Sequence, residues 1–448
     1  MEQRLLKKYD VAVPRYTSYP TAPNFQPGVT GKTYANWLGG VSRDDSVSLY
    51  FHVPFCAAMC WYCGCHTKVV NRYQPVSDYA ATLAREVDLT ADALASNPGV
   101  VHVHWGGGTP TMLSVDDFSH LMDTIQSRFR FTGQTDIAVE IDPRTLTRAM
   151  AAAMARAGVT RASLGVQDFN AHVQEAINRV QPYEVTKNAV DWLREVGINA
   201  INFDLMYGLP GQTTKDVARS VDLAHSLAPN RLALFGYAHV PWMKHHQKMI
   251  DTDALADGPG RMAQFEVAAQ RLSALGYQAI GLDHFARPDD ALSLAADEGR
   301  LRRNFQGYTT DEGQTLLGFG VSAIGSLTGG YVQNETAIGA YGRAVNAGRL
   351  PIVRGIEMTK DDRLRRAIIE QLMCGQDADL KALTAQFGMV ETFAAEQVAL
   401  APLIDDGLAE FKAGVVRITE KGRPLMRMVA AVFDRYLETG AGRHSRAV

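Results

Sequence analysis

The chain has 448 residues, of which 46% are hydrophobic and 21% are charged, and its formal net charge is −3. This is the composition of an ordinary soluble protein, and a near-neutral chain without long runs of like charge argues against nucleic acid or an anionic membrane surface as the partner. No apolar leader opens the chain, and no segment approaches the roughly eighteen uninterrupted apolar residues of a membrane-spanning helix. We therefore expect a cytoplasmic protein, without membrane insertion, that acts on a small molecule.

Short apolar runs rich in β-branched residues alternate with longer amphipathic stretches after an N-terminal segment of residues 1–45. The apolar runs predict strands over residues 46–54, 100–108, 136–142, 161–168, 199–210 and 231–241. The amphipathic stretches predict helices over residues 76–95, 115–129, 145–157, 184–196 and 214–227. Repeated strand-then-helix units are typical of a parallel sheet with helices outside it.

Nearly every predicted strand ends in residues that can do chemistry. In chain order these are a cysteine-rich loop, the stretch GGGTP, Glu140 and Asp142, Gln167 and Asp168, Asp204, and Tyr237 with His239. Ligand sites form at the carboxyl ends of strands both in barrels and in open α/β sheets. Since a barrel gathers all these ends around one axis, we predict a full or partial barrel over residues 46–300 with one shared cavity.

The sequence pattern changes twice after the sixth predicted strand. A helix over 259–275 and a possible extra strand within 277–286 are followed by a Gly-rich stretch at 304–326, part of a segment 301–355 that we expect to return to the active site. Composition then becomes helical and charged, and residues 403–433 have the pattern of a helix, a short hairpin and a helix. This predicts a mainly helical, winged-helix-like domain over 356–448.

Four of the five cysteines lie between residues 56 and 65. Cys56, Cys60 and Cys63 are separated by three and then two residues, which lets three thiolates of one loop meet at a compact metal centre. Iron-sulfur cubes usually have four cysteine ligands, so three would leave one iron open to bind a substrate. Structural zinc completed by His66 or Cys65 remains an alternative, although zinc sites generally use two separated ligand pairs and the chain has no second pair.

The CxxxCxxC spacing, with Tyr62 directly before the third cysteine, resembles the signature of the radical S-adenosylmethionine (SAM) enzymes. The resemblance implies a 4Fe-4S cluster held by Cys56, Cys60 and Cys63, whose open iron chelates the methionine part of SAM. One-electron reduction then cleaves SAM to a 5'-deoxyadenosyl radical. The protein's own contribution is orientation and the exclusion of water.

Further motifs extend the resemblance over almost the whole chain: PRYTSYPTAPNF, CGC, HWGGGTPT, VQDFN, FDLMYGLPGQT, GYAHVP, DHFARPDD and the late Gly-rich stretch. Together they are similar to the oxygen-independent coproporphyrinogen III oxidases. The fold implied is α/β, a partial (β/α)6 TIM-like barrel of the radical SAM type with an N-terminal arm over the active site and a C-terminal domain covering the cavity. A related haem chaperone is the alternative, but it typically lacks the arm and the fourth cysteine, both present here.

The activity implied by the resemblance is oxidative decarboxylation of two propionates of coproporphyrinogen III to vinyls, giving protoporphyrinogen IX in haem biosynthesis. It also implies a reduced electron-donor protein and two bound SAM molecules, of which the second is either a co-substrate or marks the site of the porphyrinogen. We expect a monomer. Matching residues for the cluster-bound SAM are Tyr50, Tyr62, Gly107, Glu140 and Ile324; those for the second SAM are Gly108, Thr109, Gln167, Arg179, Asp204 and Ala238. Candidates to bind propionates are Arg179, Arg15, Arg302 and Arg303, because guanidinium suits carboxylates.

Cys65 is separated from Cys63 only by Gly64, which makes it awkward as a second ligand of the same cube. We predict a role near the active site other than ligation, in electron or proton handling. A buried, inert thiol is the alternative, because thiolate character depends on the surroundings.

Overall fold

The computed structural model describes residues 3–9 and 11–437. Its main sheet has twelve strands in the order β16-β15-β14-β13-β1-β4-β5-β6-β7-β8-β10-β9. The six predicted strands lie next to one another in this order and run parallel. They are β1 (Ser46–Val53), β4 (Gly99–Gly107), β5 (Arg130–Ile141), β6 (Arg161–Gln167), β7 (Ala200–Tyr207) and β8 (Arg231–Gly236). The sheet ends at β16 on one side and at β9 on the other, and these two edge strands are not paired with each other in the described part of the chain. The barrel is therefore partial, as predicted.

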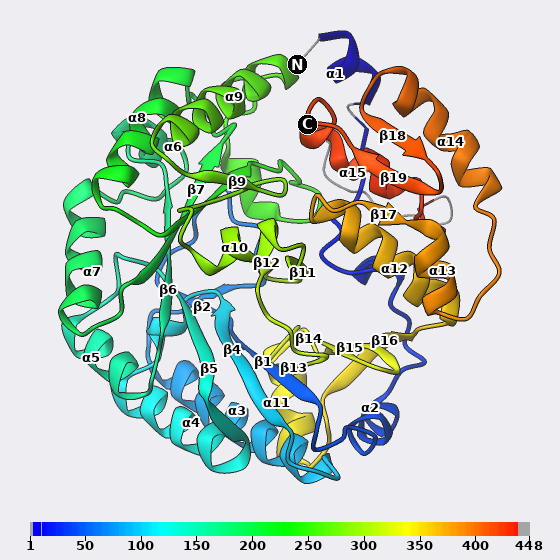
Figure 1. Cartoon of the computed structure of the whole chain (residues 1–448). Helices are drawn as coiled ribbons and strands as arrows, with labels where there is room; N and C mark the ends of the chain where they lie inside the picture. The colour runs from blue at the N-terminus through cyan, green and yellow to red at the C-terminus, as the bar shows by residue number, and fades with distance from the viewer. Residues whose placement is uncertain (1–2, 10, 438–448) are drawn as a thin grey trace.

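Helices cover the outside of these strands (Figure 1). They are α3 (Gln74–Ala93), α4 (Val115–Arg128), α5 (Arg148–Arg156), α6 (Ala171–Ala176), α7 (Tyr183–Glu195), α8 (Thr214–Ser226) and α9 (Gly258–Ala274). The side chains of Ser114, Thr147 and Thr213 accept hydrogen bonds at the first turns of α4, α5 and α8, which fixes where these helices begin. The short helix α6 was not predicted, since six residues are too few to show a helical period.

The Gly-rich segment adds strands to the β1 edge of the sheet. Strand β13 (Thr315–Phe319) pairs parallel to β1, and β14 (Ile324–Leu327), β15 (Gly330–Asn334) and β16 (Ile352–Glu357) follow antiparallel. A Cβ on Gly318 would lie 2.7 Å from the carbonyl oxygen of Ile324, so glycine is needed for β13 and β14 to approach. The Gly-rich segment therefore pairs with β1, the first strand of the barrel, although it follows the last barrel strand in the chain.

At the opposite edge the prediction of a single extra strand over 277–286 is wrong. Two short antiparallel strands, β9 (Gln278–Ile280) and β10 (His284–Ala286), occupy this stretch. Gly281 turns the chain between them with a φ of 56°, in the left-handed region that favours glycine. Strand β10 pairs antiparallel with β8 and so ends the run of parallel strands.

The C-terminal elements form a second core. They comprise α12 (Lys360–Met373), β17 (Ala378–Asp379), α13 (Leu380–Gln386), α14 (Ala394–Asp405), β18 (Ala409–Lys412), β19 (Val415–Ile418) and α15 (Met426–Ala431). Leu5, Tyr9, Val13, Tyr16 and Tyr19 of the N-terminal arm are buried in this core, and Figure 1 shows α1 (Gln3–Tyr9) beside the orange and red C-terminal elements. The later part of the arm, with α2 (Gly31–Leu38), packs on the barrel core.

Short elements complete the fold. They are η1 (Ala22–Asn24), β2 (Phe55–Cys56), β3 (Lys68–Val69), η2 (Pro110–Met112), η3 (His245–Met249), α10 (Ala291–Asp297), β11 (Arg302–Asn304), β12 (Gly307–Thr309), α11 (Ile338–Asn346) and η4 (Arg423–Leu425). Among the described residues, no helix is both long enough and apolar enough to cross a membrane. The sequence analysis divides the chain into four segments, and their boundaries stay predictions: 1–45, 46–300, 301–355 and 356–448.

Candidate active site

A cavity of about 480 Å³ lies at the carboxyl ends of the parallel strands. The structure brings most of the predicted site residues together in its wall, although they follow strands that are as distant in the chain as β1 and β8. Those residues are Cys56, Cys60, Tyr62, Cys63, Cys65, Gly107, Gly108, Thr109, Glu140, Gln167, Arg179, Asp204 and Ala238. Their roles toward a ligand stay predictions, but their shared location agrees with the expectation of one cavity.

The cysteine loop is anchored at both ends and along its length. Strands β2 and β3 pair at its two ends, where Cys56 lies opposite Val69. Asn178, after α6, donates to the carbonyl oxygen of Met59 at 2.8 Å. Side chains of residues 244–247 contact the carbonyl oxygens of Tyr62, Cys63 and Cys65 at 2.9, 2.7 and 2.8 Å. The loop is therefore fixed through its backbone, which leaves the thiols available.

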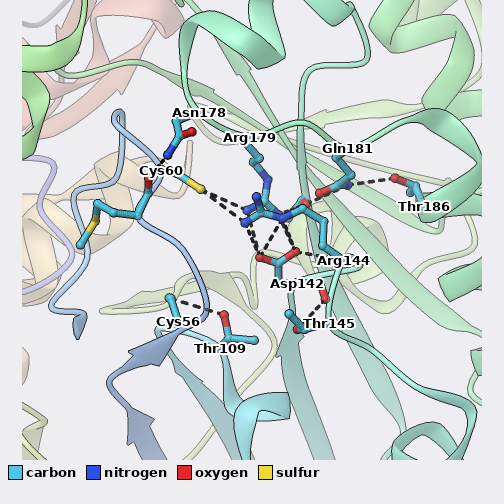
Figure 2. A network of polar contacts seen from close by, with 12 residues as sticks. Cys56, Cys60, Thr109, Asp142, Arg144, Thr145, Asn178, Arg179, Gln181 and Thr186 are labelled. Carbon is cyan, nitrogen blue, oxygen red and sulfur yellow. Dashed lines mark hydrogen bonds and ion pairs between the residues drawn. The ribbon is translucent and has the colours of Figure 1, made fainter. Parts of the chain in front are cut away.

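A buried ionic network adjoins Cys60 (Figure 2). Asp142, after β5, is paired with Arg144 at 2.7 Å and with Arg179 at 3.2 Å. Both guanidinium groups also lie 3.5 Å from the sulfur of Cys60, and Arg179 donates to the carbonyl oxygen of Gly165 at 2.6 Å. Burial opposes ionisation of Asp142, but the Arg144 hydrogen bond and the Arg179 charge outweigh it and lower the pKa of this carboxyl.

The donor set of the loop fits an iron-sulfur cluster. Cys56, Cys60 and Cys63 all line the cavity, and three thiolates on one loop are the ligands that such clusters use. Within residues 3–9 and 11–437, no three His, Cys, Asp or Glu side chains converge on a single ion position. A cube differs from a single ion because each thiolate binds a different iron.

Cys65 also lines the cavity and is exposed, which contradicts the alternative of a buried thiol. A hydrogen bond from Cys65 lowers the pKa of the neighbouring Cys63 to about 6. The carbonyl oxygen of Cys65 accepts a hydrogen bond from the ammonium of Lys244 at 2.8 Å. The predicted role of Cys65 in electron or proton handling stays a prediction.

The glycine triplet allows three close approaches between strand ends. A Cβ on Gly106 would lie 2.7 Å from the Glu140 carboxylate, and one on Gly107 would lie 2.6 Å from the ring of His52. A Cβ on Gly108 would meet the backbone of Phe55 at 2.7 Å. Each distance is too short for a side chain, so the triplet is required by the protein's own packing as well as by any ligand.

Three strand-end side chains differ in their electrostatics. Glu140 accepts from Nε2 of His104 at 3.0 Å and from the Gly107 amide at 3.2 Å; although burial opposes ionisation, these donors lower its pKa. Burial and the charge of Glu140 raise the pKa of Asp204 to about 6. Gln167 has a φ of 69° at a bulge in β6, a strained backbone of the kind that persists at functional sites.

Tyr50 and Ile324 do not line the cavity. The hydroxyl of Tyr50 lies 3.0 Å from Nδ1 of His52, and its ring stacks on His104 with centroids 5.9 Å apart. Tyr50 pairs with Gly318 in β13, which in turn contacts the backbone of Ile324. Tyr50 on β1 and Ile324 on β14 therefore lie on either side of β13. The ring of Tyr50 also stacks on His104, which contacts Glu140.

The four arginines predicted to bind propionates do not lie together. Arg15 lines the cavity and donates to the carbonyl oxygen of Gly236 at 3.1 Å. Arg302 and Arg303 line a separate, smaller cavity, where Arg302 pairs with Glu370 at 2.8 Å and Arg303 stacks over the ring of Tyr308 at 4.4 Å. Arg179 is already engaged by Asp142, so Arg15 is the one of the four placed to bind a further carboxylate.

Sequence reasoning missed Arg144 and the segment 244–247. The sequence places Asp142 at the end of a predicted strand. Arg144, two residues further on, is the sign in the sequence of an ionic network at this position. The histidines of residues 245 and 246 lie in no recognisable motif. Only the fold shows that this segment reaches the cysteine loop.

Comparison with known proteins agrees with this geometry. Residues 50–224 match the model of the radical SAM superfamily, and residues 358–425 match that of the HemN C-terminal domain. The chain is therefore a radical SAM protein, and membership of that superfamily implies a 4Fe-4S cluster and SAM.

Similarity over the full length gives the family. The chain is 51% identical to the oxygen-independent coproporphyrinogen III oxidase of Bradyrhizobium diazoefficiens, covering 97% of each chain, and 42% identical to that of Paracoccus denitrificans, covering 98% and 97%. The solved structure of coproporphyrinogen III oxidase (HemN) from Escherichia coli, described as a radical SAM enzyme, superposes with a TM-score of 0.92 at 36% identity, over 97% of this chain and 99% of that one. The chain belongs to the oxygen-independent coproporphyrinogen III oxidase family, a family of oxidoreductases.

Proposed function

We propose that this chain decarboxylates two propionate side chains of coproporphyrinogen III to vinyl groups and so produces protoporphyrinogen IX. The observation that carries the proposal is the cavity in which three loop cysteines face the ends of the parallel strands. When bound, the reduced cluster and SAM supply a primary carbon radical that removes a hydrogen atom from the β-carbon of a propionate. The substrate radical then breaks its bond to the carboxylate carbon, releases CO₂ and passes one electron to an external one-electron acceptor, which leaves the vinyl group.

The residues of the chain hold and orient these groups. Cys56, Cys60 and Cys63 are the proposed ligands of the cluster, and the hydrogen bonds to the carbonyl oxygens of Tyr62 and Cys63 hold the loop backbone next to the third thiol. Glu140 keeps an ionised carboxylate because of His104 and the Gly107 amide, which suits the ammonium or ribose hydroxyls of SAM. A primary carbon radical requires that water be kept away from the reacting groups, and this is part of the proposed role of the residues at the strand ends.

The second SAM is the finer part of the proposal. The matching residues Gly108, Thr109, Gln167, Asp204 and Ala238 all line the same cavity as the cysteines, which supports a ligand lying beside the first. Arg179 is also in this wall, but its contacts with Asp142 and Gly165 leave less of the guanidinium for a ligand. A reduced electron-donor protein is proposed as the source of the electron that each cleavage of SAM consumes.

The related haem chaperone is the competing function. The position of the N-terminal arm argues against it. Arg15 of the arm reaches the cavity wall, and five other residues of the arm are buried in the C-terminal core, namely Leu5, Tyr9, Val13, Tyr16 and Tyr19. The fourth loop cysteine, Cys65, also lines the cavity. Both features that distinguish the enzyme in sequence therefore support this proposal over the chaperone function.

An anaerobic assay of the reconstituted protein with dithionite, SAM and coproporphyrinogen III tests the proposal. We expect protoporphyrinogen IX, detected after oxidation and chromatographic separation, together with 5'-deoxyadenosine and methionine. Cleavage of SAM without decarboxylated product, combined with stoichiometric binding of haem, would instead establish the chaperone function. Cys56→Ser, which removes one proposed cluster ligand, is the matched inactive control.

A further inference from the structure

A second cavity, of about 290 Å³, adjoins the first. The two share the wall formed by Arg15, residues 236–238 and Val240, which follow strand β8. The rest of the second cavity is lined by α9 of the barrel and by the C-terminal residues Pro424 and Arg427. We call it the arginine chamber, because Arg15, Arg261 and Arg427 line it.

The three arginines reach the chamber from three separate parts of the fold. Arg15 donates to the carbonyl oxygen of Gly236 at 3.1 Å, and Arg261 donates to that of Tyr237 at 2.7 Å. Arg427, which is 6% exposed, donates to the carbonyl oxygen of Val13 at 3.3 Å. No ion pair joins Arg15 to a carboxylate within the described part of the chain. Burial and the charge of Arg15 lower the pKa of Arg427 to about 10, as expected where cations crowd together.

Two carboxylates, Asp257 and Asp283, also line the chamber. Asp257 is the N-cap of α9, where it accepts a hydrogen bond from the Gly260 amide at 2.8 Å. Asp283 lies 2.8 Å from Nδ1 of His284; burial opposes its ionisation, but His284 and the charges of Arg303 and Arg15 lower its pKa to about 2. Three guanidinium groups and two carboxylates, one of which caps a helix, therefore line the same chamber.

Aromatic rings form the remaining walls. Tyr207, Tyr237, Trp242 and Phe265 line the chamber, and the guanidinium of Arg261 lies 5.8 Å from the centre of the Tyr207 ring. Tyr237 is buried, whereas Trp242 is 48% exposed at the outer side. Flat apolar walls with arginines between them match a ligand that has a broad apolar ring system and several carboxylates on its edge.

We propose that the arginine chamber binds the carboxylates of substrate propionates that are not reacting, with Arg15, Arg261 and Arg427 as the specificity-determining residues. The inference rests on the proposed function and names where the substrate lies. A tetrapyrrole whose distal propionates occupy the chamber can extend a reacting propionate past the shared wall into the first cavity, toward Cys56, Cys60 and Cys63. Arg302 and Arg303 line a different cavity, although Arg303 donates a hydrogen bond to the carbonyl oxygen of Arg15 at 3.3 Å.

The test compares ligands that differ in the number of carboxylates. Coproporphyrin III, with four carboxylates, and mesoporphyrin IX, with two, are titrated anaerobically into the cluster-reconstituted protein, and binding is followed by porphyrin fluorescence. The wild type should bind coproporphyrin III more tightly. Arg15→Gln and Arg261→Gln should each weaken coproporphyrin III binding by roughly tenfold or more, because each removes a charge-assisted hydrogen bond, and should affect mesoporphyrin IX less. Arg15→Lys and Arg261→Lys should recover part of the loss.

Arg271→Gln is the matched control. Arg271 lies on the same helix as Arg261, but it pairs with Asp222 and is 47% exposed, so its loss should change neither affinity. Thermal unfolding of each variant identifies loss of fold. A wild type with no preference for the tetracarboxylate would overturn the proposal. Equal loss of both porphyrins in the glutamine variants would also overturn it. If the preference and its loss are seen while no protoporphyrinogen IX forms in the activity assay, the chamber stands and the proposed function fails.

Discussion

Arg144 lies 3.5 Å from the sulfur of Cys60 and is held there by Asp142, which it contacts at 2.7 Å. Hydrogen bonds to cluster sulfurs are one of the means by which a protein sets a reduction potential. The reduced cluster carries one more negative charge than the oxidised cluster. Removing a hydrogen-bond donor from a cluster thiolate therefore destabilises the reduced state more than the oxidised state. The network of Asp142, Arg144 and Arg179 around Cys60 is therefore expected to make the cluster easier to reduce.

Arg144→Gln should lower the midpoint potential of the reconstituted cluster. A lost hydrogen bond of about 0.5–1.5 kcal/mol corresponds to a shift of roughly 20–65 mV for a one-electron couple. Potentiometric titration followed by electron paramagnetic resonance measures the shift. Arg148→Gln is the control, since Arg148 pairs with Glu195 on the outer surface. An unchanged potential in Arg144→Gln would mean that this contact does not tune the cluster.

Glu140→Gln should weaken SAM binding by roughly tenfold, because the ligand loses a charged acceptor. The change also disturbs the donors at 3.0 and 3.2 Å from the carboxylate, Nε2 of His104 and the Gly107 amide. Anaerobic equilibrium dialysis with labelled SAM measures the affinity, and iron content shows whether the cluster is retained. The exposed Glu175 on α6 provides the control variant Glu175→Gln. Unaltered SAM affinity in Glu140→Gln would remove Glu140 from the proposed contacts.

Glu86 connects α3 to the late strands and predicts a pH dependence of stability. Its carboxylate is 2% exposed and accepts from the Gly320 amide at 2.6 Å, the Tyr341 hydroxyl at 2.7 Å and the Asn334 amide at 2.5 Å. Burial raises the pKa of Glu86 to about 7 from 4.5. The unfolded state therefore loses this proton at lower pH than the folded state, so the contribution of Glu86 to stability falls as pH rises from about 4.5 to 7.

Glu86→Gln should remove that part of the pH dependence, which is on the order of 3 kcal/mol in the free energy of unfolding. Urea unfolding of the wild type and the variant at several pH values between 5 and 8 gives the comparison, because all other titrating groups are shared. Parallel pH profiles for the two proteins would show that Glu86 has the same proton affinity in both states.

Gly108→Ala should destabilise the fold and impair assembly of the cluster. Its Cβ would lie 2.7 Å from the carbonyl oxygen and 2.8 Å from the amide nitrogen of Phe55, the residue before Cys56. Backbone atoms cannot move aside as a flexible side chain can, so we expect a loss of at least about 2 kcal/mol and a lower iron content. Gly133→Ala is the control, with no atom within 4 Å of the added Cβ. Normal melting temperature and iron content in Gly108→Ala would show that the contact relaxes freely.

Cys65→Ser should retain the 4Fe-4S spectrum and the iron stoichiometry, because Cys56, Cys60 and Cys63 suffice as ligands. Activity should fall if Cys65 handles electrons or protons in the cavity that it lines. Iron analysis and electron paramagnetic resonance are the measurements, with Cys374→Ser, a buried thiol of the C-terminal region, as the control. Loss of the cluster in Cys65→Ser would assign Cys65 to its ligands.

The barrel and the residues at its strand ends could be predicted from the sequence because apolar runs mark buried parallel strands. The pattern Cys56, Cys60, Cys63 and the strand-end residue Glu140 then follow from local sequence alone. The hairpin at 277–286 could not be predicted in this way, since a short apolar run does not show the turn at Gly281.

Contacts that depend on distant packing were also beyond prediction. Arg144 reaches Cys60 from 84 residues away. Arg261 and Arg427 look like ordinary helical charges in the sequence, and only the docking of the C-terminal elements on the barrel brings them to one chamber. Arg302 and Arg303 were candidates because of their residue type. Their position also depends on distant packing, and they line a different cavity.

The most direct measurement of the central claim uses coproporphyrinogen III deuterated at the β-carbons of its propionates. It is incubated anaerobically with the reconstituted protein, SAM and reductant, and the 5'-deoxyadenosine is analysed by mass spectrometry. We predict transfer of one deuterium into 5'-deoxyadenosine for each propionate converted to a vinyl group. Protoporphyrinogen IX formed with unlabelled 5'-deoxyadenosine, or labelled substrate recovered unchanged while SAM is consumed, would contradict the account.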